Sequence, residues 1–124
     1  MRIITSKSCS LNLEKIHSKF PFKNKAQILR IAIAISLKYE KKYNENVSYT
    51  KDGFEINSET LFGGHLDLFN AILKIYYNEL LSDDDNYVNV LTHHIETGIE
   101  ILINEMNYHN DDLDFIKFII EGSV

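Results

Sequence analysis

The stretch Ala26-Gln27-Ile28-Leu29-Arg30-Ile31-Ala32-Ile33-Ala34-Ile35-Ser36-Leu37 decides the fold class, because it is apolar on almost every face of a helix. Asn24 can cap the start of this helix, and Gln27 stands at its third position, which is a variant of the capping box. We expect the helix to run to about Asn44. A helix in water is ordinarily apolar along one stripe only. This one must therefore be covered on all sides, either as the central helix of the domain or by a second subunit.

A shorter helix is expected before it. Ser10 can cap a helix that runs from Leu11 to about Phe20. Pro21 ends that helix, because the residue before a proline avoids helical geometry. The residues Arg2 to Thr5 form a short β-prone stretch. This order is typical of a helix-turn-helix, or of a ribbon-helix-helix if Arg2 to Thr5 pairs with a partner strand.

The rest of the sequence predicts one irregular segment and three more helices. Residues Asn46 to Leu61 read as irregular or as a hairpin, with Asp52-Gly53 as a turn. After the Gly63-Gly64 break, the apolar spacing predicts helices at His65–Leu81, from about Tyr87 to Met106, and, after a cap at Asn110, at Asp111–Glu121. In the first of these, Leu66, Phe69, Ile72, Leu73 and Tyr76 stand at helical spacing. The predicted fold class is therefore mainly α, a compact single domain over residues 1–124.

Length and composition exclude several classes of protein. The chain has 124 residues, of which 44% are hydrophobic, so a folded core is expected rather than disorder. No apolar run reaches the roughly 20 residues of a membrane helix, and the N-terminus lacks the pattern of a signal peptide. The one cysteine, Cys9, cannot form an internal disulfide. These features predict a cytoplasmic protein in a reducing compartment.

The charges are divided unevenly along the chain. Residues 1–51 hold eleven lysines and arginines against three glutamates, a charge of +8. The remaining residues hold two lysines against fifteen acids, a charge of −13, so the whole chain carries −5. Such asymmetry is a hint of polyanion binding on one side. The alternative is that the two halves attract each other or a second copy.

The strongest candidate site is a group of four lysines around the first interhelical turn. Lys15 and Lys19 are four residues apart, so they share one face of the first helix. Lys23 and Lys25 stand in the turn and at the start of the next helix. Lysines beside a helix start form a surface suited to phosphates, and such contacts position a protein on DNA without reading its sequence. The alternative is an ordinary solvated lysine face.

No pattern argues for a metal, a cofactor or catalysis. His93 and His94 are adjacent and point about 100° apart on a helix, so they do not easily share one ion. His17, His65 and His109 are scattered, and HExxH is absent. His94 lies on the apolar side of its helix and is expected to be a packing residue. We therefore expect a protein without enzymatic activity, metal or cofactor.

Three segments together resemble the DndE family, the small subunit of bacterial DNA phosphorothioation systems. They are the apolar run Ile28–Leu37 with its Ser-Leu end, the segment from Phe54-Glu55-Ile56-Asn57 through Thr60-Leu61-Phe62-Gly63 followed by Leu68-Phe69 and Leu73, and His94-Ile95 with Gly98-Ile99. Their order and spacing carry the resemblance, which spans about residues 10 to 106.

The resemblance implies a helical fold that assembles as a homo-oligomer, a tetramer in the family. It implies binding to double-stranded DNA through basic residues, with a preference for nicked DNA. It also implies partnership with other subunits of the phosphorothioation complex, which carry the iron–sulfur and ATPase chemistry. Lys15, Lys19, Lys23 and Lys25 occupy the region that matches the family's lysine-rich binding segment.

Two other functions remain open at this stage. The protein could be an assembly subunit that joins its complex through the acidic C-terminal helices without touching DNA. It could also be a sequence-specific ribbon-helix-helix or helix-turn-helix regulator. The low number of arginines and the lack of a reading head beyond Gln27 argue against base readout.

Overall fold

The computed structural model describes residues 1–77, 84–108 and 117, and it is mainly α-helical, as the sequence predicted. Its elements in chain order are β1 (Arg2–Ile4), α1 (Lys7–Lys19), α2 (Lys25–Lys38), β2 (Glu55–Asn57), α3 (Ser58–Phe62), the 3-10 turn η1 (Gly63–His65), α4 (Leu66–Tyr77) and α5 (Asp84–Tyr108). Two predictions lie outside the described residues. One is the end of the helix His65–Leu81, and the other is the helix Asp111–Glu121 with its cap Asn110.

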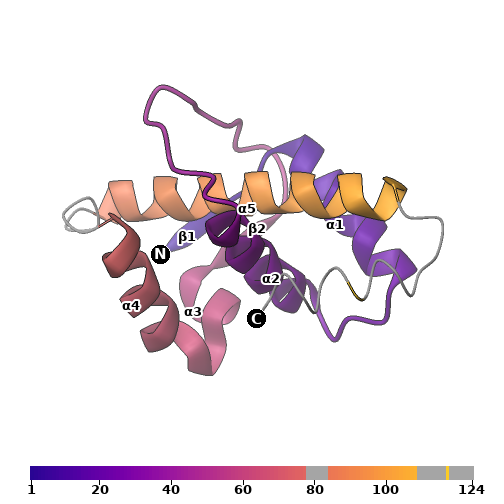
Figure 1. Ribbon diagram of the computed structural model, residues 1–124, viewed down its shortest axis with the longest axis horizontal. Helices are drawn as coiled ribbons and strands as arrows, with labels where there is room; N and C mark the ends of the chain where they lie inside the picture. The colour runs from indigo at the N-terminus through magenta and orange to yellow at the C-terminus, as the bar shows by residue number, and fades with distance from the viewer. Residues whose placement is uncertain (78–83, 109–116, 118–124) are drawn as a thin grey trace.

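The core is built on the crossing of α2 and α5. Figure 1 shows α5 running along the longest axis of the molecule, with α2 crossing it. These two helices share the most extensive contact in the fold, and α1 packs on α5 as well. Eight of the fourteen residues of α2 are buried, and Arg30 on α2 donates from a guanidinium nitrogen to the backbone oxygen of Leu61, 2.7 Å away. The apolar α2 is therefore the central helix of the chain's own fold.

Helix α1 begins earlier than its sequence suggested. Its cap is Ser6 rather than Ser10, because the Ser6 hydroxyl accepts a hydrogen bond from the Cys9 backbone N–H at 3.1 Å. The Glu96 carboxylate on α5 fixes this cap, since it accepts from the Ser6 N–H at 2.7 Å and from the Ser6 hydroxyl at 2.6 Å. The helix ends at Phe20, which is extended as expected before Pro21. A contact from a distant helix thus selects the start of α1.

Helix α2 ends at Lys38, six residues before the predicted end near Asn44. Glu40 follows in the left-handed conformation with φ 56°. The Lys41 N–H donates to the Ser36 oxygen at 3.0 Å, and the Glu40 N–H donates to the Leu37 oxygen at 3.1 Å. This pair of bonds is the Schellman motif, which satisfies the last carbonyls of a helix.

Of the two alternatives expected for Asn46–Leu61, an irregular segment or a hairpin, the structure shows an irregular segment that leads into β2. Strand β2 pairs antiparallel with β1, with Ile3 opposite Ile56. A Cβ at Gly53 would lie 2.2 Å from the Ser6 backbone oxygen, so this glycine allows close approach of the loop to the start of α1. Because β1 pairs with β2 of its own chain, β1 does not form an intersubunit ribbon, whereas α1 and α2, joined by a short turn, keep the predicted helix-turn-helix layout.

The segment α3–α4 packs against the α2–α5 core from one side. The rings of Phe62 and Phe69 stack with centroids 4.7 Å apart and join the two helices. Leu73 on α4 is fully buried, whereas Ile72 is 36% exposed. None of the helices in the described part of the chain is long and apolar enough to cross a membrane.

Candidate nucleic-acid interface

All four predicted lysines lie at the corner where α1 turns into α2. Lys15 and Lys19 are on α1, Lys23 is in the turn, and Lys25 is the first residue of α2. Lys15, Lys19 and Lys23 are exposed, whereas Lys25 is half-buried. At 100° per residue, Lys15 and Lys19 fall on one flank of α1, away from its buried stripe.

Local hydrogen bonds hold the backbone of this corner. The Asn24 side-chain oxygen accepts from the Gln27 N–H at 2.9 Å and caps α2. The Gln27 side-chain oxygen accepts in return from the Lys23 N–H at 2.8 Å, which confirms the predicted variant of the capping box. The Phe20 and Phe22 rings meet edge to face at 6.3 Å. The lysines therefore project from a rigid turn.

Lys25 differs from Lys15 and Lys23 because its ammonium group is engaged within the chain. Its Nζ lies 2.5 Å from a carboxylate oxygen of Glu14 and 5.2 Å from the centre of the Phe54 ring. The hydrogen bond from Lys25, together with its charge, lowers the pKa of Glu14 below its ordinary value. Glu14 and Lys15 lie about 100° apart on α1. The Lys25–Glu14 pair thus lies on a different flank from Lys15.

Lys15 and Lys23 are the exposed lysines of the corner that lack an ion pair among the described residues. The Lys19 ammonium lies over the Phe20 ring, 5.7 Å from its centre, and its side chain remains exposed. Lys15 and Lys23 are accordingly placed to reach an external anion, whereas Lys25 is paired with Glu14.

A second group of cations, which the sequence analysis counted but did not place in the site, follows the other end of α2. Lys38, Lys41, Lys42 and Lys51 are exposed, and all but Lys38 lie in the loop between α2 and β2, which Figure 1 shows projecting to one side of α5. Helix α2 has fourteen residues, so the two groups are about 21 Å apart along its axis. A sequence prediction that ended α2 at Lys38 would have placed the following lysines in the loop and grouped them.

The adjacent histidines of α5 serve packing, as expected for His94. The Thr97 hydroxyl donates to the His93 backbone oxygen at 2.9 Å, so it accepts from the Ser36 hydroxyl at 2.5 Å. The Ser36 oxygen must then accept from His94 Nδ1–H at 2.7 Å. On the other side of the ring, Tyr77 accepts from the Tyr43 N–H and donates to His94 Nε2. His94 is therefore neutral with its proton on Nδ1.

His93 is held in the opposite tautomer. Its Nε2 contacts the Lys41 backbone oxygen at 2.8 Å, and because a carbonyl only accepts, Nε2 carries the proton. Its Nδ1 accepts from the Tyr49 hydroxyl at 3.0 Å. Burial first, and His93 second, lower the pKa of His94 to about 3. All four ring nitrogens are used within the protein, and the described residues contain no cluster of three metal-ligating side chains.

Ser36, His94 and Gly98 meet where α2 crosses α5. A Cβ at Gly98 would lie 2.0 Å from the Ala32 backbone oxygen, so only glycine allows the two helices this close. Ser36 and His94 are fully buried one helical turn away and are joined by a hydrogen bond. These residues belong to the segments that carry the DndE resemblance. In this fold these residues let α2 and α5 approach closely and join the two helices by a hydrogen bond.

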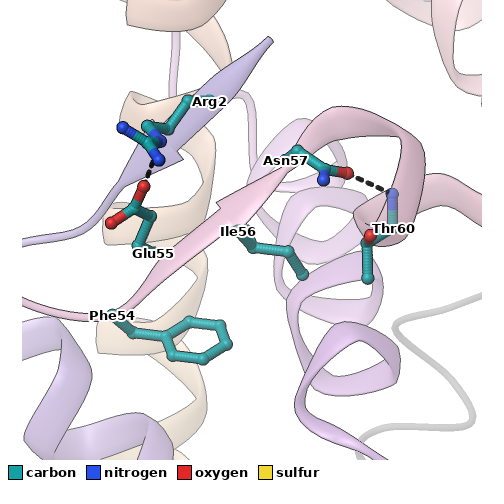
Figure 2. A pocket seen from close by; sticks show the side chains of 6 residues that line it. All are labelled: Arg2, Phe54, Glu55, Ile56, Asn57 and Thr60. Carbon is teal, nitrogen blue, oxygen red and sulfur yellow. Dashed lines mark hydrogen bonds and ion pairs between the residues drawn. The ribbon is translucent and has the colours of Figure 1, made fainter.

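A hollow of about 460 Å³ lies beside β2. Figure 2 shows Arg2 and Glu55, which form an ion pair, on one side of the strand, and Phe54 and Ile56 on the other. Asn57 closes one end, where its side-chain oxygen caps α3 by accepting from the Thr60 N–H at 2.7 Å. The hollow is open, and its lining combines the Arg2–Glu55 ion pair with the side chains of Phe54, Ile56, Asn57 and Thr60.

Comparison with known proteins identifies the fold and the family. The family model described as "DNA sulphur modification protein DndE" matches residues 2–110. Among solved structures, the chain is similar to a crystal structure of DndE from Escherichia coli B7A, a protein involved in DNA phosphorothioation modification. The TM-score is 0.67 and the identity 22%, over 82% of this chain and 95% of the other. No curated protein sequence matches the chain significantly.

Proposed function

The chain belongs to the DndE family of DNA sulphur modification proteins, and from this we propose that it is the non-enzymatic, DNA-binding subunit of a phosphorothioation system. It contacts the phosphate backbone of double-stranded DNA through Lys15, Lys19 and Lys23. We place it in the cytoplasm, as a homo-oligomer associated with the other subunits of the system, and we include nicked duplex among its ligands.

The observation that carries the proposal is the rigid lysine corner. Lys15 and Lys23 are exposed and lack an ion-pair partner among the described residues. Lys23 stands in a turn that two hydrogen bonds hold in place, and Lys15 stands on the helix before it, so little backbone ordering is needed when phosphates bind. Lysine contacts to phosphate give affinity without base specificity, which suits a subunit that delivers a complex to DNA.

Salt-dependent binding tests this directly. Each lysine that contacts a phosphate adds about 0.9 to the slope of the logarithm of affinity against the logarithm of salt concentration. We expect Lys15→Ala and Lys23→Ala each to lower the slope by roughly 1 per protomer and to weaken binding equally on unrelated duplexes. Lys74→Ala is the matched control, because Lys74 is an exposed lysine on α4, away from the corner.

Lys25 gives an internal comparison within the same corner. Since its ammonium group is paired with Glu14, Lys25→Ala removes one charge without removing a phosphate contact, and we expect it to change the slope by clearly less than 1. Equal slopes for the wild type, Lys15→Ala and Lys23→Ala, or an equal effect from Lys74→Ala, would overturn the proposal. Intact duplex and duplex with one central nick are compared in the same series.

A second candidate function, assembly with other subunits, is favoured by the surface of α4. Leu68, Ile72 and Ile75 lie at positions i, i+4 and i+7 of α4, and they are 58%, 36% and 84% exposed. Exposed apolar stripes of this kind mark interaction sites. If this surface binds other phosphorothioation subunits, Leu68→Ser with Ile75→Ser abolishes their co-purification and leaves the salt slope for DNA unchanged.

A further inference from the structure

The hollow beside β2 adjoins the lysine corner. Phe54 lines the hollow, and the Lys25 ammonium group lies over its ring, 5.2 Å from the ring centre. Lys25 is the first residue of α2 and stands two positions after Lys23 of the turn. A strand of DNA whose phosphates are held at the corner therefore has the hollow beside it.

The side chains around the hollow stand in two layers, one on each face of β2. Phe54 and Ile56 lie on one face, and the Arg2–Glu55 ion pair lies on the other. The Phe54 side chain is half-buried, and the Arg2 side chain is 75% exposed. Aromatic rings and arginine guanidinium planes are the groups on which unpaired nucleobases stack in proteins that bind single strands.

The outer edge of β2 adds free backbone groups to this hollow. The Thr5 N–H donates to the Phe54 oxygen at 2.8 Å, and hydrogen-bonded pairs alternate along antiparallel strands. The backbone of Ile56 therefore bonds to β1, whereas the backbone groups of Glu55 and Asn57 point away from it. In the described residues, the Glu55 N–H, the Glu55 C=O and the Asn57 N–H have no hydrogen-bond partner in the protein. The edge thus presents a donor, an acceptor and a donor in a row.

On the basis of the proposed DNA contact, we propose that the hollow receives one unpaired nucleobase of a strand whose phosphates lie on the lysine corner. The base stacks between Phe54 and Arg2, and its hydrogen-bonding edge meets the backbone of β2. The Glu55 C=O with the Asn57 N–H suits adenine and cytosine, whereas the Glu55 N–H with the Glu55 C=O suits guanine and thymine. A paired base stays in the duplex stack, so the site takes a base that is already unpaired, which costs least to move.

Two duplexes of equal length and charge test the proposal. Each carries one extrahelical nucleotide in the middle, which is adenosine in one duplex and an abasic residue in the other. Both duplexes present the same phosphates to the lysines, so their difference in affinity measures the contribution of the base alone. Because one base stacked on an aromatic side chain contributes about tenfold in affinity, we expect the wild type to bind the adenosine duplex about tenfold more tightly.

Three variants locate the effect in the hollow. Phe54→Leu keeps an apolar side chain but removes the ring, and it should bring the ratio of the two affinities close to one. Phe22→Leu is the matched control, because Phe22 is a half-buried ring of the corner that packs on Phe20, and it should leave the ratio unchanged. Arg2→Gln should lower the ratio about threefold. Circular dichroism establishes that each variant is folded, and Arg2→Gln carries the test if Phe54→Leu is not.

Equal affinity of the wild type for the two duplexes would contradict the proposal. So would a ratio that Phe54→Leu leaves unchanged, or one that Phe22→Leu lowers as much. Lys15→Ala tests the DNA contact separately, because it should weaken binding of both duplexes equally and preserve their ratio. A salt slope that ignores the lysines removes the proposed function, whereas a normal slope with a ratio of one removes only the base site.

Discussion

Lowering the pH below the ordinary pKa of histidine should destabilise this fold through His94. In the unfolded chain His94 titrates near 6.5, whereas in the folded protein burial lowers its pKa to about 3. Between these two values only the unfolded chain binds the proton, so acid favours unfolding. The contribution is complete above pH 6.5 and is lost progressively as the pH falls toward 3.

The size of the effect follows from the distance between the pH and the unfolded pKa. About pH 5 lies roughly 1.5 units below 6.5, and each unit corresponds to about 1.4 kcal/mol, which gives a loss of about 2 kcal/mol. The hydrogen bonds agree with this direction, because Tyr77 donates to the unprotonated Nε2 of His94. A proton on that nitrogen would have to displace the Tyr77 hydroxyl hydrogen.

Urea unfolding at pH 7.5 and at about pH 5 measures the effect, with His94→Asn as the comparison. The Asn side chain keeps a donor toward Ser36 but cannot titrate, so its free energy of unfolding should lose about 2 kcal/mol less than that of the wild type between the two pH values. Nitrogen chemical shifts of the histidine rings should show His94 as the Nδ1–H tautomer in the folded protein at both pH values. Equal pH dependence in both proteins, or a folded His94 that titrates near 6.5, would refute this reasoning.

Three further changes test other parts of the structure by urea unfolding or thiol reactivity. Gly98→Ala puts a Cβ 2.0 Å from the Ala32 oxygen and should lower the free energy of unfolding by about 2–3 kcal/mol. Gly64→Ala, with nothing within 4 Å of its Cβ, should lower it far less. Equal losses in the two variants would contradict the close approach of α2 and α5. Glu40→Gly relieves a φ of 56° at the end of α2 and should gain about 0.5–1 kcal/mol, and a clear loss would argue against the Schellman end. Burial and the nearby Glu96 carboxylate raise the pKa of the Cys9 thiol, so Cys9 should resist alkylation at pH 8 until the protein is unfolded. Rapid alkylation of the folded protein would contradict this packing.

The sequence predicted those parts of the fold that depend on neighbours along the chain. Three predictions that depend only on nearby residues are confirmed: the Asn24 cap with Gln27, the end of α1 before Pro21, and the burial of α2. The choice of Ser6 over Ser10 as the cap of α1 depends on Glu96, ninety residues away. The pairing of β2 with β1 is similarly long-range. Neither can be inferred from local propensity, because distant contacts override it.

In the candidate site too, the sequence predicted what depends on nearby residues and missed what depends on distant contacts. Spacing along α1 and the turn predicted correctly that Lys15, Lys19 and Lys23 would be exposed. It could not show that Lys25 is paired with Glu14, because Glu14 is eleven residues earlier on another helix. The cations at the far end of α2 were also missed as a group, since their grouping depends on where α2 ends. The exposure of a lysine side chain can thus be predicted from helix periodicity. Whether the lysine forms an ion pair with a residue on another helix depends on the tertiary structure.

The buried helix crossing and the proposed DNA contact involve different residues of this chain. Ser36, His94 and Gly98 belong to two of the three segments that carry the resemblance, and each is buried at the crossing of α2 and α5, where substitution changes stability. The lysines of the corner lie on the surface, where most substitutions change stability little. A relative could therefore keep the crossing and lose the lysines without any change of fold. DNA binding by this protein must consequently be decided by the lysine variants, because the fold that places it in the family does not depend on them.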